Sequence, residues 1–178
     1  MPYPNLRNEK KLNKKGYKYI AGVDEAGKGS WAGPIVAGAV ILDPKIKIKG
    51  VKDSKLLRAP DREKLFKEIK QKAIAYGVGQ VSASMIDKMG IVKANVLAMQ
   101  RALEKLEPQA NYILIDAVKL EYGQTPVESI IDGDHKITTI AAASIVAKVS
   151  RDKMMEKLDD KYPKYSFKQH KGYGTPGH

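Results

Sequence analysis

The apolar positions of this chain recur with two spacings, one typical of strands and one typical of helices. Short apolar runs predict strands over residues 17–23, 34–42, 73–82 and 111–116. Apolar residues three and four positions apart predict helices over residues 61–72, 91–106 and 138–158, with a short helical turn capped by Ser84. Residues 117–130 are expected to form a loop and residues 133–135 a turn. This order predicts a mixed α/β domain with one central sheet.

Three segments depart from this simple pattern. Residues 1–16 are basic and polar, which predicts a solvated lead-in with some helix. Residues 141–147 are almost all small or apolar, so their helix is expected to pack closely against the sheet. Residues 162–178 form a basic, aromatic tail with two prolines. No internal repeat or linker divides the chain, so its 178 residues are expected to share one core.

The net charge of the chain indicates which classes of binding partner are favoured. Thirty-two Lys and Arg residues against twenty Asp and Glu residues give a net charge of +12, which favours nucleic acid or an acidic membrane surface. The absence of cysteine excludes disulfides and thiolate metal sites. No apolar run is long enough to span a bilayer, and residues 1–15 lack the apolar core of a signal peptide. We therefore expect a cytoplasmic protein that does not enter a membrane.

Four acids stand where predicted strands stop and loops begin: Asp24, Glu25, Asp116 and Asp134. Grouped together without a counterion they would repel one another. Mg²⁺ or Mn²⁺ would remove that conflict, because hard cations prefer carboxylate oxygens. Two such ions about 3.5–4 Å apart can clamp a phosphodiester for hydrolysis. Taken singly, each acid has an ordinary alternative explanation as a strand-end or turn residue.

The adjacent pair Asp24 and Glu25 poses a geometric difficulty. Neighbouring residues of a regular strand point to opposite faces of the sheet. The two side chains could converge if the strand ends at the pair and twists into the glycine turn at Gly27, with the longer Glu25 reaching round.

Several ordered motifs resemble the type 2 ribonucleases H, specifically bacterial ribonuclease HII. They are Gly22-Val23-Asp24-Glu25-Ala26-Gly27 with Ala32-Gly33-Pro34, Asp53-Ser54-Lys55, Ile115-Asp116, Gly133-Asp134, residues 141–148 with Arg151-Asp152, and His170-Lys171-Gly172-Tyr173-Gly174-Thr175. The resemblance covers nearly the whole chain. It implies a ribonuclease H-like fold, with a central mixed β-sheet flanked by helices, over residues 17–161, and a short C-terminal segment over 162–178 that completes the substrate site.

The resemblance also implies an activity and its residues. The family cleaves the RNA strand of RNA–DNA hybrids and cuts 5′ to single ribonucleotides in duplex DNA, leaving 3′-hydroxyl and 5′-phosphate ends by two-metal catalysis. Asp24, Glu25, Asp116 and Asp134 match its four metal-binding acids. The substrate-binding positions that match are Gly27, Lys28 and Gly29 for the ribose and Tyr173 under the sugar next to the cut. Lys55 is expected to contact the phosphate backbone or to lie near the scissile group, and its ordinary alternative is a solvated lysine. A monomer is expected.

Two departures from the family pattern bear on substrate binding. The family's loop usually reads Gly-Arg-Gly, whereas Lys28 takes the middle place here and cannot make the planar two-pronged contact of arginine. Lysine at this position also occurs in the sister group ribonuclease HIII, which makes a HIII-like hybrid nuclease an alternative. The chain ends at His178, where family members generally continue into another helical segment.

The sequence also suggests three other interpretations. Asp152 is a rival for the fourth metal-binding acid, but it lies inside the predicted helix 138–158, where it can pair with Lys148. A dinucleotide-binding loop is disfavoured because Gly33 falls one residue late and Pro34 follows it. A non-catalytic nucleic-acid-binding protein would explain the charge and the aromatic tail, but not acids gathered at strand ends.

Overall fold

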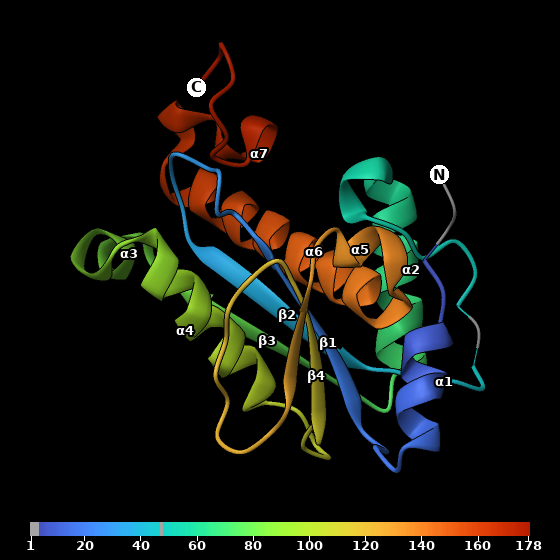
Figure 1. Ribbon diagram of the computed structural model, residues 1–178. Coiled ribbons are helices and arrows are strands. Elements are labelled where there is room, and N and C mark those ends of the chain that lie inside the picture. Colours follow the sequence, from blue (N-terminus) through green and yellow to red (C-terminus); the bar gives the residue numbers. More distant parts are fainter. Residues whose placement is uncertain (1–3, 47) are drawn as a thin grey trace.

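The computed structural model describes residues 4–46 and 48–178, which form one five-stranded mixed sheet flanked by helices (Figure 1). The strands are β1 (Ile20–Ala26), β2 (Ile35–Ile41), β3 (Ala75–Val81), β4 (Tyr112–Asp116) and β5 (Val127–Ile130). Their order across the sheet is β3-β2-β1-β4-β5. The first three strands pair antiparallel, whereas β4 runs parallel to β1 and β5 parallel to β4. The carboxyl ends of β1, β4 and β5 therefore meet at one edge of the sheet.

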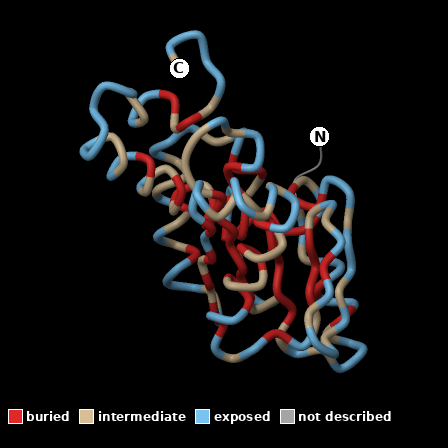
Figure 2. The backbone as a smooth tube through the Cα atoms, turned by 90° about the vertical axis from the view of Figure 1, so that its left-hand side faces the viewer, coloured by how far each residue is buried: buried red, intermediate tan, exposed pale blue. Residues whose placement is uncertain are grey.

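Helices cover both faces of this sheet. They are α1 (Arg7–Lys14), α2 (Ala59–Lys72), α3 (Ala83–Met89), α4 (Ile91–Leu103), α5 (Gly133–Lys136), α6 (Thr138–Lys161) and α7 (Phe167–His170), with 3₁₀ turns at Ser54–Leu56 and Pro163–Tyr165. Apolar residues of α4 pack on one face, and those of α6 and α2 pack on the other. Figure 2 shows the buried chain concentrated between these layers. None of the described helices has the length and apolar character needed to cross a membrane.

The close packing predicted for residues 141–147 is confirmed. A Cβ on Gly22 would overlap the backbone of Thr139, and one on Gly38 would overlap the carbonyl oxygen of Ala143. Glycines on β1 and β2 therefore let the backbone of α6 approach the sheet directly. This approach brings α6 next to the strand that carries Asp24.

Three sequence-based predictions were wrong at the level of elements. Residues 127–130 form strand β5 rather than a loop; the two middle residues of this strand, Glu128 and Ser129, are exposed and polar, so it has no apolar run. Pairing with β4 supplies the hydrogen bonds that create it. Residues 133–136 form the short helix α5 rather than a plain turn. The cap of α3 is Ser82, whose hydroxyl accepts from the Met85 N–H, and not Ser84.

The N-terminal segment is more buried than its composition predicts. Helix α1 places Leu12 in a small apolar cluster against α6, and Glu9 is only 1% exposed. Glu9 Oε1 accepts from the backbone N–H of Thr139 at 3.1 Å and from its hydroxyl at 3.0 Å. The carboxylate thus caps the first turn of α6 from a distant part of the chain. The proposed division into a lead-in, a catalytic domain and a tail stays a prediction.

Candidate metal and nucleic-acid site

Asp24 and Glu25 lie side by side on the central strand β1. The condition that the strand ends at this pair is not met, because β1 continues through both residues to Ala26. They point to opposite faces, as a regular strand requires: Asp24 lies beside Ser144 of α6, and Glu25 beside Asn95 of α4. Because the two carboxylates point to opposite faces, they can belong to one site only if a third group at the edge of the sheet lies near both.

Asp116 is that third group. It ends β4, the parallel neighbour of β1, one residue beyond the pair Val23–Ile115. Its charge acts on Asp24 and on Glu25. Its Oδ1 also accepts from the Gly133 N–H at 2.7 Å, which fixes the start of α5 against the end of β4.

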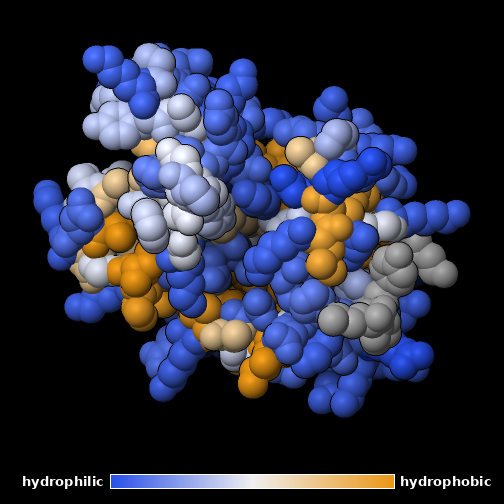
Figure 3. Space-filling view, turned by 90° about the horizontal axis from the view of Figure 1, so that it is seen from above, coloured by the Kyte–Doolittle hydropathy of each residue, from blue (hydrophilic) through white to orange (hydrophobic). Residues whose placement is uncertain are grey.

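Asp134 is the second residue of α5 and is buried. The structure thus gathers the four predicted acids, which we call the carboxylate centre: Asp24, Glu25, Asp116 and Asp134. They come from two adjacent strands and one short helix. The surface seen from this end of the molecule is largely hydrophilic (Figure 3).

The negative charges of the carboxylate centre repel one another. Burial raises the pKa of Asp24 well above its usual value, and the charges of Glu25 and Asp116 raise it further. Burial likewise raises the pKa of Asp134, with Asp53 and Asp116 adding to the shift. The pKa of Glu25 is raised by burial and by Asp116, although Lys28 opposes the shift. Glu25 Oε2 is buried and has no hydrogen-bond partner among the described residues. A hard divalent cation would relieve all of these features together.

A second cluster shares Asp134 with the first. Ligand atoms of Asp53, Asp134 and His135 lie within 4.8 Å of one another. His135 Nε2 is 3.8 Å from Asp53 Oδ2 and 3.9 Å from Asp134 Oδ1. The sequence analysis did not assign Asp53 to the site, although the motif Asp53-Ser54-Lys55 was a signal for it. Asp53 caps the 3₁₀ turn by accepting from the Lys55 N–H at 3.0 Å.

Both predicted substrate-binding lysines border the carboxylate centre. Lys28 Nζ lies 3.7 Å from Glu25 Oε1, and Lys55 Nζ lies 3.9 Å from Asp134 Oδ2. The Lys55 side chain is 77% exposed. Partial burial alone would lower the pKa of Lys55, but the surrounding carboxylates, first among them Asp53, raise it. Both ammonium groups therefore lie beside acids of the carboxylate centre.

The two glycines of the predicted ribose-sensing loop have different environments. Gly27 has a positive φ of 102°, and a Cβ there would overlap the guanidinium of Arg151. A Cβ on Gly29 would meet no described atom within 4 Å. Gly27 is thus required by the fold of the loop. Gly29 is exposed, so its backbone is open to solvent. The assignment of both glycines to the ribose stays a prediction.

Tyr173 lies above two cations of α6. The Lys148 ammonium is 5.0 Å from the centroid of its ring, and the Arg151 guanidinium carbon is 5.2 Å from it. Sequence reasoning noted Arg151 only as part of a motif. A signal was available, because Arg151 follows Ser144 and Ala147 at helical spacing and precedes Met155, all of which are buried. A charged residue on the buried face of a helix needs hydrogen-bond partners inside the protein.

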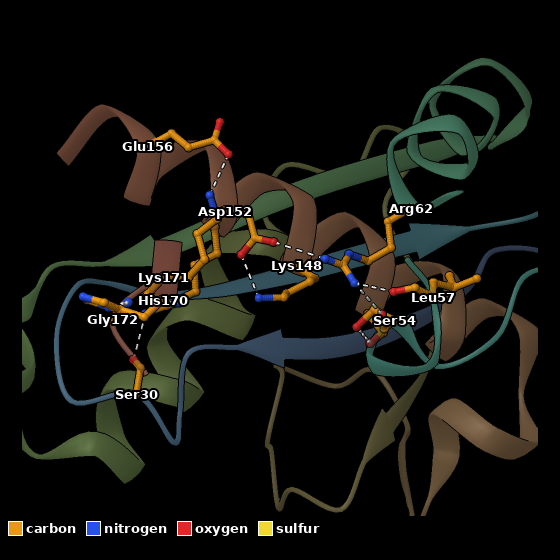
Figure 4. Close-up of polar contacts among 12 residues, drawn as sticks. Ser30, Ser54, Leu57, Arg62, Lys148, Asp152, Glu156, His170, Lys171 and Gly172 are labelled. Carbon is orange, nitrogen blue, oxygen red and sulfur yellow. Dashed lines mark hydrogen bonds and ion pairs between the residues drawn. The ribbon is translucent and has the colours of Figure 1, made fainter. Parts of the chain in front are cut away.

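Asp152 makes the pairing expected of it. Its Oδ1 is 2.7 Å from Lys148 Nζ, and its Oδ2 is 3.6 Å from Arg62 Nη2. Arg62 in turn donates to the carbonyl oxygens of Ser54 and Leu57. In Figure 4, Asp152 lies between Arg62 on one side and the C-terminal segment on the other. The residue therefore ties the Asp53–Lys55 turn to α6.

Comparison with known proteins places these features in a family. The family model for ribonuclease HII matches residues 21–178. A ribonuclease HII from Ruminiclostridium cellulolyticum is 51% identical over 97% of this chain and 68% of its own length, and one from Desulfitobacterium hafniense is 50% identical over 97% and 66%. The chain thus spans about two thirds of the length of these relatives. A ribonuclease HII from Dehalococcoides mccartyi is 49% identical, over 98% of this chain and 84% of its own length.

Solved structures agree with this placement. The ribonuclease H2 of Pyrococcus horikoshii superposes with a TM-score of 0.76 at 33% identity, covering 90% of this chain and 83% of that one. The ribonuclease HII of Archaeoglobus fulgidus, solved in a complex with PCNA, gives a TM-score of 0.73 at 27% identity, with 90% and 84% covered. The predicted ribonuclease H-like fold is confirmed by these neighbours. The chain therefore belongs to the ribonuclease HII family, a family of nucleases.

Proposed function

We propose that this protein is a divalent-metal-dependent endoribonuclease that hydrolyses the RNA strand of RNA–DNA hybrids and cuts 5′ to single ribonucleotides embedded in duplex DNA. The observation that carries the proposal is the carboxylate centre itself. Four acids with mutually repelling charges, of which Asp24 and Asp134 are buried, lie at the carboxyl edge of the sheet in a protein of net charge +12. Membership of the ribonuclease HII family supports the substrate class.

Asp24, Glu25, Asp116 and Asp134 are the residues that would hold Mg²⁺ or Mn²⁺. They fit such ions because they offer only oxygen ligands and because Glu25 Oε2 has no partner among the described residues. When bound, a pair of such ions supplies a nucleophile at neutral pH and stabilises charge on the transferring phosphate. His135 and Asp53 lie beside Asp134 and would orient its carboxylate.

The surrounding residues bind and orient the substrate. Lys28 and Lys55 attract the phosphates on either side of the cut, since each ammonium already faces the carboxylate centre. The exposed backbone at Gly29 approaches the ribose 2′-hydroxyl. Tyr173 packs under the neighbouring sugar, with the cations below it holding the ring in place.

These assignments predict the base-sequence specificity of the enzyme and the products of cleavage. Contacts to phosphate and sugar carry no information about base sequence, so cleavage is expected to be nearly independent of sequence. Hydrolysis on the 5′ side of the ribonucleotide leaves 3′-hydroxyl and 5′-phosphate ends. The protein acts on hybrid and ribonucleotide-containing duplexes as a monomer in the cytoplasm.

The test is a cleavage assay resolved to single nucleotides. A labelled DNA duplex with one ribonucleotide and a full RNA–DNA hybrid are incubated with Mg²⁺, with Mn²⁺ and with EDTA. We expect metal-dependent cutting 5′ to the lone ribonucleotide, lost in Asp24→Asn and retained in Asp87→Asn, which removes an exposed acid on α3. Binding without cleavage under every metal condition would refute the proposal and favour a non-catalytic nucleic-acid-binding protein.

A further inference from the structure

Arg151 is a fully buried arginine in the middle of α6, with an exposed fraction of 0%. Its guanidinium donates four hydrogen bonds to two distant segments. Nε donates to the Pro34 carbonyl at 2.9 Å, and Nη2 donates to the Ser30 hydroxyl at 2.8 Å and to the Ala32 carbonyl at 3.0 Å. Nη1 donates to the Lys171 carbonyl at 2.7 Å. One side chain thus joins the glycine loop, residues 27–34, to the C-terminal segment.

The same two segments also touch each other. The N–H groups of Trp31 and Ala32 both donate to the Gly172 carbonyl, at 2.9 Å and 3.2 Å. Gly172 has a positive φ of 81°, and a Cβ there would overlap the Ala32 carbonyl oxygen. We call this contact the loop–tail junction, formed by residues 27–34 and 171–173. Figure 4 shows Ser30, Lys171 and Gly172 together beside α6.

Arg151 reaches both parts of the junction that face the substrate. At one end its side chain fills the space that a Cβ on Gly27 would need, so it sets the conformation at the start of the loop. At the other end its guanidinium carbon lies 5.2 Å from the centroid of the Tyr173 ring. The separation between the glycine loop and the tyrosine is therefore held by two sets of contacts. One is the pair of backbone hydrogen bonds to the Gly172 carbonyl, and the other is the planar guanidinium of Arg151, whose donors cannot rotate independently.

We propose that Arg151 is a positioning residue that fixes the glycine loop relative to Tyr173 and thereby sets the preference for a single ribonucleotide over a continuous hybrid. This rests on the proposed function. A lone ribonucleotide offers one 2′-hydroxyl, so the loop and Tyr173 must engage adjacent sugars at the same time. A continuous hybrid offers a 2′-hydroxyl at every step, and a displaced loop can still find one. Small misplacements therefore cost more on the first substrate.

The chemistry of the side chain makes the substitution informative. Lysine keeps the positive charge but presents a single nitrogen, which cannot serve acceptors on both segments in the geometry of a planar fork. Arg151→Lys therefore loosens the spacing while keeping the charge, since only the backbone hydrogen bonds to the Gly172 carbonyl then join the two segments directly. Ser30→Ala is a milder variant, because it removes one of the four acceptors and leaves the guanidinium bonded to three carbonyls.

The experiment compares kcat/KM on two substrates, a duplex with one ribonucleotide and a continuous RNA–DNA hybrid. We expect Arg151→Lys to lower kcat/KM on the single ribonucleotide about 10-fold more than on the hybrid. Ser30→Ala should shift the ratio in the same direction by a smaller factor. Tyr173→Ala should shift it as well, and the double variant Arg151→Lys with Tyr173→Ala should add little to either single change. Arg101→Lys, on α4 and bonded to the Gln80 carbonyl, should leave the ratio unchanged.

Trp31 provides a readout of the junction without any substrate. It is the only tryptophan of the chain, it is 77% exposed, and its ring packs over Gly174. Its emission maximum should shift in Arg151→Lys and not in Arg101→Lys. An unchanged substrate ratio in both Arg151→Lys and Ser30→Ala would overturn the positioning role. Equal losses on both substrates, in proportion to the unfolded fraction, would show that Arg151 serves the fold alone. If the unsubstituted protein cleaved neither substrate, the proposed function would fail instead.

Discussion

The carboxylate centre and the loop–tail junction differ in how their buried charges are balanced. The carboxylate centre stands on regular strands and a short helix, and its charges are left in conflict, with burial and neighbouring acids raising the pKa values of Asp24 and Asp134. The loop–tail junction has little regular structure, yet the buried charge of Arg151 on α6, which joins its two segments, is satisfied by four hydrogen bonds. A rigid frame can hold an unfavourable arrangement that a ligand relieves, whereas irregular segments need internal bonds to keep their shape.

The largest expected effect comes from removing charge from the carboxylate centre. Asp116→Asn keeps the acceptor for the Gly133 N–H but removes the charge that acts on the three other acids. Activity should fall on the order of 10³-fold, while the free energy of unfolding without metal rises by about 1 kcal/mol. Mg²⁺ should raise the Tm of the unsubstituted protein far more than that of the variant. Cleavage assays and thermal melts check this, and a loss of stability in the variant would contradict the idea of stored repulsion.

Removing the buried charge at the loop–tail junction should change stability in the opposite direction. Arg151→Met removes the buried cation and leaves its carbonyl acceptors without donors, so the free energy of unfolding should fall by about 3 kcal/mol. Urea unfolding followed by Trp31 emission measures the change. Arg101→Lys serves as the control on the opposite face of the sheet. If Arg151→Met were as stable as the unsubstituted protein, the junction would not depend on its buried charge.

Glu9 gives a test of a buried acid outside both regions. Burial raises its pKa above the usual 4.5, although the hydrogen bonds from Thr139 oppose the shift. An acid with a raised folded pKa binds protons more tightly in the folded state, so stability falls as pH rises from about 4.5 through the folded pKa. Each pKa unit of the shift corresponds to about 1.4 kcal/mol.

Glu9→Gln should remove that pH dependence. The variant keeps an oxygen acceptor for Thr139 and cannot ionise, so it should gain stability relative to the unsubstituted protein between pH 4 and pH 7. Urea midpoints at several pH values measure the gain. Glu104→Gln, at an exposed position after α4, is the matched control. Parallel pH profiles for Glu9→Gln and the unsubstituted protein would contradict this prediction.

The smallest expected effect concerns Lys28. Replacing it with the arginine usual in the family adds a planar donor pair for a phosphate beside the cut, while its contact with Glu25 can persist. Lys28→Arg should lower KM for the single-ribonucleotide duplex about 2- to 5-fold and leave kcat nearly unchanged. Steady-state kinetics at two salt concentrations measures this. A change in kcat without a change in KM would place Lys28 in the chemical step instead.

Local patterns in the sequence were enough to predict four of the five strands and the main helices, because these segments bury long apolar runs or faces. They were not enough for β5, whose exposed, polar middle residues form a strand only through pairing with β4. The start of β1 was also placed too early, because Tyr17 lies outside the sheet and packs edge-on against Tyr112 instead. Pairing partners and packing partners are long-range contacts, and no local pattern encodes them.

The sequence by itself determined which chemical groups the protein carries: an excess of basic residues, three acids at the ends of predicted strands with a fourth in a predicted turn, and glycines at the positions where the chain must turn or approach closely. The tertiary structure alone decided how Asp24 and Glu25, on opposite faces of one continuous strand, come to share a site with Asp116. It also decided that Glu9 caps α6 and that Arg151 joins two segments more than a hundred residues apart in the chain. Residue types carry their charge and hydrogen-bonding capacity in any context. The partners that satisfy or oppose that capacity exist only once the chain has folded.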